Sequence, residues 1–230
     1  MREFWDERAR EDAFYFVDNR INYKDSAEEE RFWEMGREDL DRLLGAVDVG
    51  LEPDWVVAEI GCGVGRLTRV ISERVGAVKA LDVSAEMLSI ARAENVRLAN
   101  VDWILGDGIS LAGIDDGVAD AVVSHVVFQH IPDPQITLGY IREAGRVLRQ
   151  GGVAVLHVSN DERVHELRQP LSGRIRAALG RAPKGQAHAA WTGSAVDLEE
   201  VSVAAADGGM ALEKVVGKGT QYTVLRLRRQ

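Results

Sequence analysis

Residues 56–65 read Val-Val-Ala-Glu-Ile-Gly-Cys-Gly-Val-Gly, an apolar run followed by three glycines at alternating positions. The apolar run predicts a buried β-strand, and the glycines predict a tight turn into a helix that begins near Arg66. Glycine has no Cβ, so a ligand can approach the backbone of such a turn closely. Dinucleotide-binding proteins use a similar turn, but their third glycine stands at the sixth position, where this chain has Arg66. The stretch therefore indicates a ligand-binding strand–turn–helix unit with a different spacing, in which Glu59 precedes the glycines.

The composition indicates a globular α/β protein. The chain has 230 residues, which suits one domain with an added lid and a core that buries about 70% of the unfolded surface. Its net charge of −9 argues against a general nucleic-acid binder, whose binding face would be basic. The start of the chain has no apolar signal-peptide core, no apolar run approaches about 18 residues, and the single cysteine excludes an internal disulfide. We therefore expect a soluble cytoplasmic protein with no nucleic-acid or membrane partner.

Strand-like and helix-like segments alternate along the chain, which predicts a Rossmann-like, seven-stranded, mostly parallel sheet with helices on both faces. The expected strands are Trp55–Ile60, Ala77–Val83, Val101–Leu105, Ala119–His125, Gly152–Val158, Ala211–Val216 and Tyr222–Leu227. The expected helices are Arg66–Val75, Ala85–Glu94, Pro134–Leu148 and Val196–Asp207. Only a hairpin fits between the last two strands, so the last strand is expected to be antiparallel. Residues 1–50 are expected to form an N-terminal helical lid, and residues 51–230 the main domain with a cap insertion at about 163–195.

Acidic and polar residues stand where the first four strands end. Glu59 and the glycines end the first strand, and Asp82 ends the second, 21 positions after Gly61. That spacing suits a carboxylate that binds both hydroxyls of a ribose. Asp107 follows the third strand and Ser124-His125 the fourth, and ligands of such sheets bind at the carboxyl ends of the strands. Each residue alone has a plain alternative, because Asp82 could cap the next helix and Asp107 could belong to a turn; the ordered series predicts one binding site.

This series, over residues 54–160, resembles the motifs of class I S-adenosylmethionine-dependent methyltransferases. The stretches 129–134 and 143–152 are similar to the branch that acts on small molecules, sugars and natural-product scaffolds. The Asn/Asp-Pro-Pro-Tyr/Phe signature of enzymes that methylate amide or base nitrogens is absent after the fourth strand. The resemblance therefore implies S-adenosyl-L-methionine as cofactor and a small-molecule acceptor.

The resemblance also implies a set of cofactor-binding residues: Trp5, Glu59, Gly61, Cys62, Gly63, Gly65, Asp82, Val83, Met87, Asp107, Gly108, Ile109, Ser124 and His125. Within this set, Glu59 and the glycines would neighbour the methionine moiety, and Asp107 would bind the adenine amino group. Met87 could contact the adenine or pack in the core. Trp5 lies in Phe-Trp-Asp-Glu-Arg-Ala at 4–9, a lead-in that closes over the cofactor in this family or packs on the core.

A hydroxyl acceptor needs a general base, and histidine is the usual choice. His130 lies six residues beyond Ser124, where several small-molecule methyltransferases carry a catalytic histidine; the alternative is that it caps the following turn. Its pKa would be near 6.5 if unperturbed. Asp161 could orient or replace such a base, whereas His125 is expected in the pocket wall and His157 in the core. No metal-ligand spacing is present in the sequence.

Two regions outside the sheet bear on the acceptor. Eight of the fourteen aromatic residues lie in the first 33 positions, where they require a partner surface or a pocket to bury them. Residues 167–196 contain five Lys or Arg residues and no Asp or Glu. This second region is either a solvated loop or a site for an anionic acceptor.

We therefore expect a methyltransferase that acts on a hydroxyl, less readily on an amine, of a small molecule. A nicotinamide-dependent oxidoreductase is the alternative from another enzyme class, and Arg66 at the sixth position argues against it. A non-catalytic, cofactor-binding partner that regulates another enzyme is the alternative from outside catalysis, and it would bind the cofactor without turnover.

Overall fold

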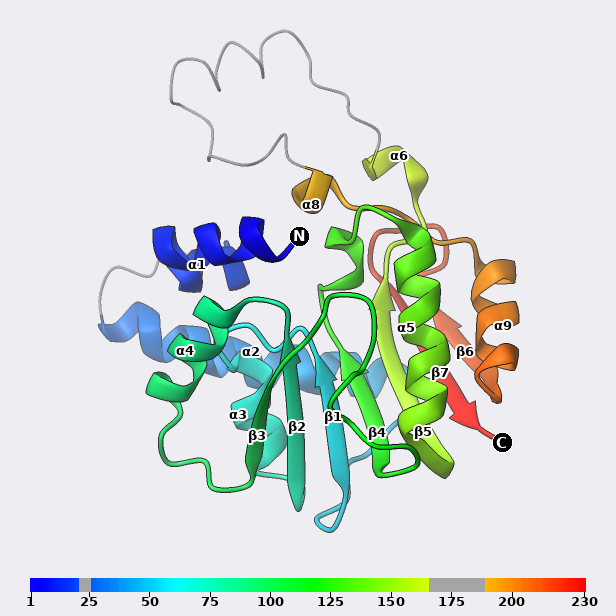
Figure 1. Cartoon of the computed structure of the whole chain (residues 1–230), viewed down its shortest axis with the longest axis horizontal. Helices are drawn as coiled ribbons and strands as arrows, with labels where there is room; N and C mark the ends of the chain where they lie inside the picture. Colours follow the sequence, from blue (N-terminus) through cyan, green and yellow to red (C-terminus); the bar gives the residue numbers. More distant parts are fainter. Residues whose placement is uncertain (21–25, 166–188) are drawn as a thin grey trace, which may run out of the picture.

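A seven-stranded sheet with helices on both faces forms the body of the protein (Figure 1). The computed structural model describes residues 1–20, 26–165 and 189–230. The strands are β1 (Val56–Ile60), β2 (Ala77–Asp82), β3 (Val101–Leu105), β4 (Ala119–Ser124), β5 (Leu148–Val158), β6 (Met210–Val216) and β7 (Thr223–Arg229). Their order is β3-β2-β1-β4-β5-β7-β6, and β7 alone is antiparallel to its neighbours. The predicted fold class and the antiparallel last strand are confirmed.

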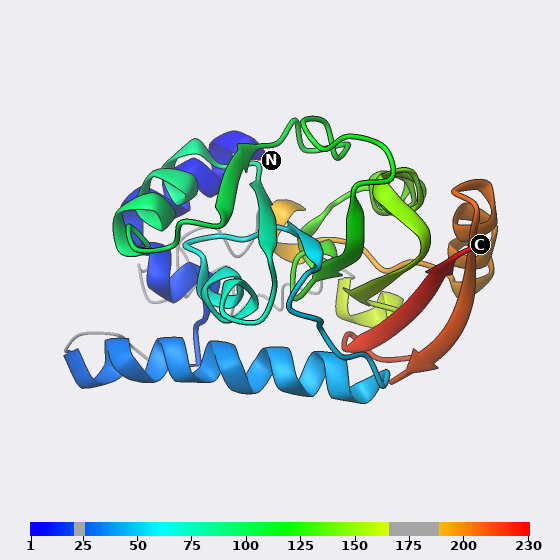
Figure 2. The ribbon, with the colours of Figure 1, turned by 90° about the horizontal axis from the view of Figure 1, so that it is seen from below.

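Helices connect the strands and cover the sheet. They are α1 (Arg2–Val17), α2 (Ser26–Ala46), α3 (Arg66–Ser72), α4 (Ala85–Glu94), the 3-10 turn η1 (Phe128–His130), α5 (Pro134–Val147), α6 (Glu162–His165), α8 (Ala189–Thr192) and α9 (Leu198–Asp207). Figure 2 shows α2 along one face of the sheet, with α5 and α9 on the other side. None of the described helices is long and apolar enough to cross a membrane.

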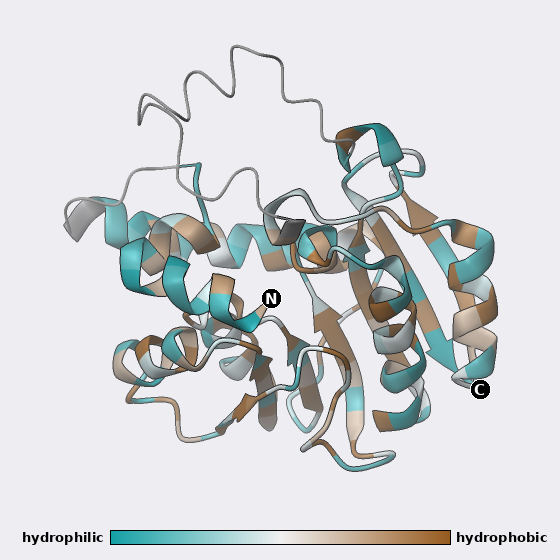
Figure 3. Ribbon diagram, turned by 45° about the horizontal axis from the view of Figure 1, so that its top comes forward, coloured by the Kyte–Doolittle hydropathy of each residue, from teal (hydrophilic) through white to brown (hydrophobic). Residues whose placement is uncertain are grey.

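Both faces of the sheet are buried, which explains why the central strands are apolar along their length rather than alternating. All six residues of β4 are buried, and Figure 3 shows the strands as mostly hydrophobic. One face packs against α2 and α3, where α2 presents Leu40, Leu43 and Leu44 at helical spacing and Val47 follows directly after the helix. The other face packs against α5 and α9. Apolar layers therefore pack on both faces of the sheet and fix the positions of its strand ends.

Side-chain caps set where the helices begin. The hydroxyl of Ser84 accepts the N–H of Met87 at 3.1 Å and starts α4. Asp133 caps α5 ahead of Pro134, a residue whose missing N–H costs nothing in the first turn. Asp197 accepts the N–H groups of Glu199 and Glu200, so α9 begins two residues later than predicted.

The strand β5 begins earlier than the predicted Gly152. Leu148 already pairs with Ala119 of β4, and a register shift follows before Val153 pairs with Ala121. Gly151 and Gly152 therefore lie inside an irregular strand, in which Gly151 has a φ of +78°.

The N-terminal helix α1 lies across the carboxyl ends of β2 and β3 (Figure 1). Its Arg2 guanidinium donates to the carbonyls of Val83 and Gly106, at 3.1 and 2.7 Å. The Asp6 carboxylate accepts the hydroxyl of Ser84 at 2.6 Å. The helix is interrupted at Asp12, whose φ and ψ are −170° and 87°. These bonds hold the first half of α1 over the edge of the sheet at which the predicted site lies.

Two glycines of α5 give a matched test of the packing. A Cβ at Gly145 would lie 2.1 Å from the Gly208 carbonyl oxygen beside α9, whereas a Cβ at Gly139 would have no neighbour closer than 3.8 Å. We expect Gly145→Ala to lower the free energy of unfolding by about 1–3 kcal/mol through overpacking. Gly139→Ala should raise it by about 0.5–1 kcal/mol, because alanine favours the helix. Urea unfolding of both variants measures this, and equal effects would contradict the close α5–α9 contact.

Candidate functional site

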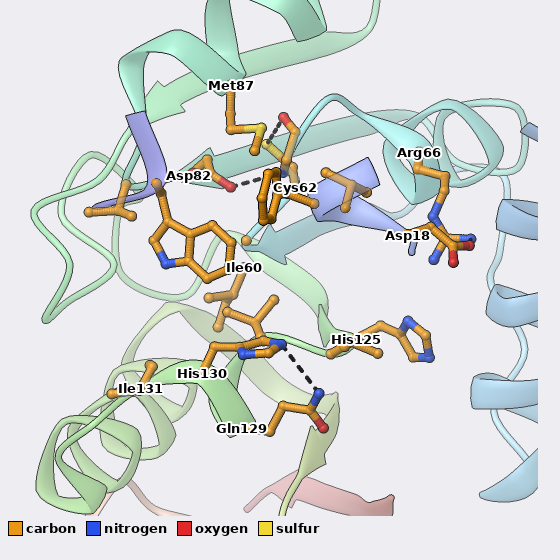
Figure 4. A pocket seen from close by; sticks show the side chains of 18 of the residues that line it. Asp18, Ile60, Cys62, Arg66, Asp82, Met87, His125, Gln129, His130 and Ile131 are labelled. Atoms are coloured by element: carbon orange, nitrogen blue, oxygen red, sulfur yellow. Dashed lines mark hydrogen bonds and ion pairs between the residues drawn. The ribbon is translucent and has the colours of Figure 1, made fainter. Parts of the chain in front are cut away.

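A cavity of about 580 Å³ opens at the carboxyl ends of β1, β2 and β4. Its wall includes the turns after those strands, residues 16–20, and residues of α8 and of the β6–β7 loop, with further side chains from α1, α2, α5 and α6. Figure 4 shows Asp82 and Met87 at one end, Arg66 and Asp18 at another, and His130 with Gln129 on the opposite wall. A volume of this size suits a small organic ligand.

The glycine turn after β1 is tied to β2. The N–H groups of Gly61 and Cys62 both donate to the Leu81 carbonyl, at 2.7 and 3.1 Å. All three glycines of the turn have positive φ, between +55° and +88°. At Gly61 a Cβ would lie 2.3 Å from the Val127 side chain across the cavity wall. Glycine is therefore required by both conformation and space, as the sequence predicts.

Asp82 ends β2 with its carboxylate fixed by backbone. One oxygen accepts the Ser84 N–H at 2.8 Å and the other accepts the Gly63 N–H at 2.9 Å. The side chain lines the cavity and the residue is only 8% exposed. Burial raises the pKa of Asp82, although these backbone bonds favour its charged form. A carboxylate held in this way presents its remaining lone pairs in one orientation.

Glu59 lies beside it at the end of β1 and is 4% exposed. The Thr68 hydroxyl of α3 donates to its carboxylate at 2.5 Å. Burial, together with the nearby charge of Asp82, raises the pKa of Glu59 from 4.5 to about 7. A cationic group bound next to Glu59 would favour the ionised carboxylate.

An ionic cluster of buried Asp18, Asp39 and Arg66 with the exposed Arg20 forms the wall at the other end. The Arg66 guanidinium donates to Asp39 at 2.8 Å, and Arg20 bridges Asp18 and Asp39. Burial by itself would raise the pKa of Asp39, but the bonds from Arg20 and the charge of Arg66 outweigh it and lower that pKa. The cluster joins the two N-terminal helices to the start of α3.

His130 lies in the wall as a neutral imidazole. Its Nδ1 is 3.2 Å from the Trp191 carbonyl, so this nitrogen carries the proton and donates. Its Nε2 is 3.3 Å from the Gln129 amide nitrogen and therefore accepts. Burial lowers the pKa of His130 to about 4. The Trp5 and Trp191 rings each lie 5.6 Å from its ring centre.

Most of the predicted site residues come together in this one cavity. Those that line it are Trp5, Glu59, Gly61, Cys62, Gly63, Asp82, Val83, Met87, Gly108, His125 and His130. Met87 also packs in a small apolar cluster between α1, α2 and α4, and its predicted contact with the adenine stays a prediction. Burial raises the pKa of the Cys62 thiol, as expected for a packing residue rather than a nucleophile.

Five predicted residues lie outside the cavity wall: Gly65, Asp107, Ile109, Ser124 and Asp161. Asp107 accepts the N–H groups of Ile109 and Ser110, which is the turn role that the sequence left open. The Ser124 hydroxyl donates to the Ile60 carbonyl inside the sheet. Asp161 pairs with Arg163 at 2.8 Å and, among the described residues, forms no hydrogen bond with a histidine. Its carboxylate is taken up by this local pair, and the geometry gives no support to a catalytic role for Asp161.

Sequence reasoning missed several wall residues. Arg66 was considered only as the residue that breaks the dinucleotide pattern, although it directly follows the glycines. Asp18 and Asp39 reach the cavity through helix packing that no sequence motif signals. Gln129 and Trp191, which contact His130, were also missed. Of the basic stretch 167–196, residues up to 188 lie outside the described part of the chain, so its predicted role stays a prediction.

Residues 58–156 match the family model described as a methyltransferase domain. Over 109 residues the chain is 30% identical to a ubiquinone biosynthesis O-methyltransferase of Xanthomonas campestris. That match covers 47% of this chain and 44% of the relative, so the chain matches less than half the length of this relative.

Solved structures share the fold over nearly the whole chain. Magnesium protoporphyrin IX methyltransferase from Synechocystis, with bound S-adenosylhomocysteine, superposes with a TM-score of 0.63 at 16% identity, covering 100% of this chain and 98% of that one. An N-methyltransferase from Bradyrhizobium japonicum, also with S-adenosylhomocysteine, gives 0.62 at 17% identity, covering 99% and 97%. The resemblance predicted from the sequence is confirmed over residues 58–156, which match a methyltransferase domain, and the fold over the chain is shared with solved methyltransferases that hold S-adenosylhomocysteine.

The raised pKa of Glu59 makes a prediction about stability. Because its pKa is about 7 in the fold and 4.5 otherwise, its contribution is fully present below pH 4.5 and is lost as the pH rises through 7. Glutamine cannot ionise, so Glu59→Gln should gain stability relative to wild type over that range. The gain should level off above pH 7 at about 3 kcal/mol. Urea unfolding at several pH values measures it, and a difference that does not change with pH would contradict a raised pKa.

Proposed function

We propose that this protein transfers a methyl group from S-adenosylmethionine to a hydroxyl group of a small-molecule acceptor. The observation that carries the proposal is a neutral histidine, His130, in the same cavity as the glycine turn and the Asp82 carboxylate. The chain's match to its curated relatives is partial, so their substrates do not transfer to it directly. The acceptor is inferred from the residues of this cavity.

The residues around the turn fit the cofactor. Glycines leave room for a ligand against the backbone, and Asp82 offers a fixed acceptor for ribose hydroxyls. Val83, Met87 and Gly108 lie beside it and would contact the adenine, while Glu59 would face the methionine amino group. When bound, the cofactor supplies a methyl group on a positively charged sulfur. The protein would then contribute mainly proximity and orientation.

His130 would act as the general base. Its Nδ1–H is held by the Trp191 carbonyl, which leaves the lone pair on Nε2 to take a proton. The Gln129 amide now donates to that nitrogen at 3.3 Å, and its own Oε1 is buried without a hydrogen-bond partner in the described part of the chain. A hydroxyl that displaced this amide could donate to His130. A hydroxyl needs such a base, whereas a neutral amine does not, so the neutral histidine favours a hydroxyl acceptor.

Aromatic rings from distant parts of the chain surround this position. Trp5 comes from α1, Trp191 from α8 and Tyr222 from the β6–β7 loop, and all three line the cavity. Phe16 continues the set, 5.9 Å from Trp191 between ring centres. Cavity-lining residues from Gly108 onward include no Asp, Glu, Lys or Arg among the described residues. An acceptor with a flat, uncharged ring next to the reacting hydroxyl fits this wall.

We also propose that residues 1–50 act as a lid on the domain formed by residues 51–230. The bonds of Arg2 and Asp6 to the turns after β2 and β3 support this role. The interruption at Asp12 gives α1 a point at which its first half could move.

Calorimetry with S-adenosylmethionine and S-adenosylhomocysteine tests the cofactor, and a nicotinamide dinucleotide in the same titration tests the alternative enzyme class. We expect micromolar binding of the first two and none of the third. A methyl-transfer assay with catechol, a flat dihydroxy ring, then separates an enzyme from a non-catalytic binding partner. If the protein bound neither S-adenosylmethionine nor S-adenosylhomocysteine, the proposal would be refuted.

Asp82→Asn should weaken S-adenosylhomocysteine binding by about 1.5–3 kcal/mol, because a charged acceptor of hydroxyl groups is lost. The variant should also lose stability, since Asp82 holds two backbone N–H groups. Asp120→Asn is the matched control: Asp120 is also buried and accepts the backbone N–H of Val56, at the far end of the sheet. We expect Asp120→Asn to lose stability but to keep wild-type affinity for S-adenosylhomocysteine. Equal affinities in the two folded variants would refute the ribose assignment.

His130→Asn should retain the bond to the Trp191 carbonyl but cannot take a proton, so turnover should fall by about 10²–10⁴ while cofactor affinity is unchanged. Because burial lowers the pKa of His130 to about 4, the wild-type rate should stay level from pH 6 to 8 and decline only toward pH 4. This replaces the sequence-based expectation of a transition near 6.5. Full turnover in His130→Asn would show that the residue only caps its turn.

A further inference from the structure

His157 forms hydrogen bonds to two loops that line the cavity. It lies on β5 and is 2% exposed. Its Nδ1 accepts the backbone N–H of Val126 at 2.9 Å, and its Nε2 lies 2.9 Å from the Gln221 carbonyl. Val126 belongs to the loop after β4, and Gln221 to the loop between β6 and β7. Both residues line the cavity.

These two bonds define one protonation state. A ring nitrogen that accepts an N–H carries no proton, so Nδ1 is bare and Nε2 donates to the carbonyl. In a doubly protonated ring the Nδ1–H would face the Val126 N–H, so two hydrogen-bond donors would point at each other. Burial lowers the pKa of His157, which is consistent with a neutral ring. The side chain therefore works as a rigid link with one accepting and one donating end.

The first loop is strained where His157 holds it. Val126 has a φ of +57°, a left-handed conformation that is rare for a β-branched residue and costs about 1–3 kcal/mol. The next residue, Val127, lies against Gly61, where a Cβ would be 2.3 Å from its side chain. The hydrogen bond to Nδ1 thus helps to hold a backbone turn that places Val127 against the glycine turn.

The second loop is held by the same ring in two ways. Besides the bond to Gln221, the Tyr222 ring stacks on the imidazole, with 5.7 Å between centres and 7° between planes. Tyr222 is 61% exposed and lines the cavity. His125, also in the wall, lies 5.5 Å from His157 between ring centres.

We propose that His157 is a positioning residue: by joining the loop of residues 125–127 to the loop of residues 221–222, it sets the shape of the acceptor half of the cavity. It does not touch the reacting atoms, and its effect is on which acceptors fit. That this half of the cavity binds the acceptor rests on the proposed function. The link between the two loops is a property of the fold and can be tested separately.

Three substitutions separate the two ends of the ring. In His157→Asn the amide oxygen can replace Nδ1 as acceptor for Val126, and in His157→Gln the amide nitrogen can replace Nε2 as donor to Gln221. His157→Phe keeps a ring that can stack on Tyr222 but makes neither bond. Leu225→Val is the control, because Leu225 is fully buried on the neighbouring strand β7 and lies outside the cavity wall. It should lower stability without changing either loop.

Amide hydrogen exchange of the full chain, measured without added cofactor, tests the link directly. We expect the Val126 amide to exchange at least about tenfold faster in His157→Phe, since the loss of one hydrogen bond to a buried group is of that size. Protection should return in His157→Asn but not in His157→Gln, and Leu225→Val should resemble wild type after correction for global stability. Unchanged protection of Val126 in His157→Phe would overturn the proposal.

Kinetics test the consequence for the acceptor. With catechol as probe, His157→Phe should raise KM by about tenfold, with a smaller change in kcat, while affinity for S-adenosylhomocysteine stays within about threefold. His157→Asn should recover part of the loss. If KM rose in proportion to the loss of stability in both Leu225→Val and His157→Phe, the role of His157 would be purely structural and the proposal would be overturned. Absence of S-adenosylhomocysteine binding in the wild type would instead refute the proposed function and leave the exchange result to decide the link.

Discussion

The carboxylate of Asp82 is the point at which the separate parts of the site are joined. One oxygen holds the glycine turn through Gly63, and the other holds the start of α4 through Ser84. Ser84 in turn caps α4 and donates to Asp6 of the N-terminal helix. A few hydrogen bonds thus join the sheet, the glycine turn, α4 and the N-terminal helix α1. A buried carboxylate is stable there only because backbone N–H groups satisfy it.

Burial also sets which groups around the cavity are charged. The ionic cluster of Asp39 and Arg66 stays ionised because each charge has a partner, and removing one partner would leave an uncompensated buried charge. His125 and His130 have no such carboxylate partner among the described residues, so burial keeps both neutral. The cavity therefore combines a charged half, formed by residues 18–82, with an uncharged aromatic half around His130 that includes Trp5, Phe16, Trp191 and Tyr222. The first suits a zwitterionic cofactor and the second a neutral ring.

Much of the fold follows from short-range patterns. The run at 56–60 is apolar because its strand is buried on both faces, and the glycines after it are needed for a turn with positive φ. Alternating strands and helices predicted the parallel sheet, and the short connection after Val216 predicted the antiparallel pair. Because parallel strands end at one edge, the same patterns brought Glu59, Asp82 and His125 to one cavity.

The sequence by itself determined the fold class, the cofactor class and the edge of the sheet where the site lies, because each of these depends on residues within a strand or turn. Only the tertiary structure decided the rest of the wall. Asp39 and Trp191 reach the cavity through packing of segments far apart in the chain, and no local pattern records such contacts. The same holds for His157, whose two partners come from different loops. Protonation states were likewise decided by the fold, since burial shifts a pKa by an amount that depends on every surrounding group.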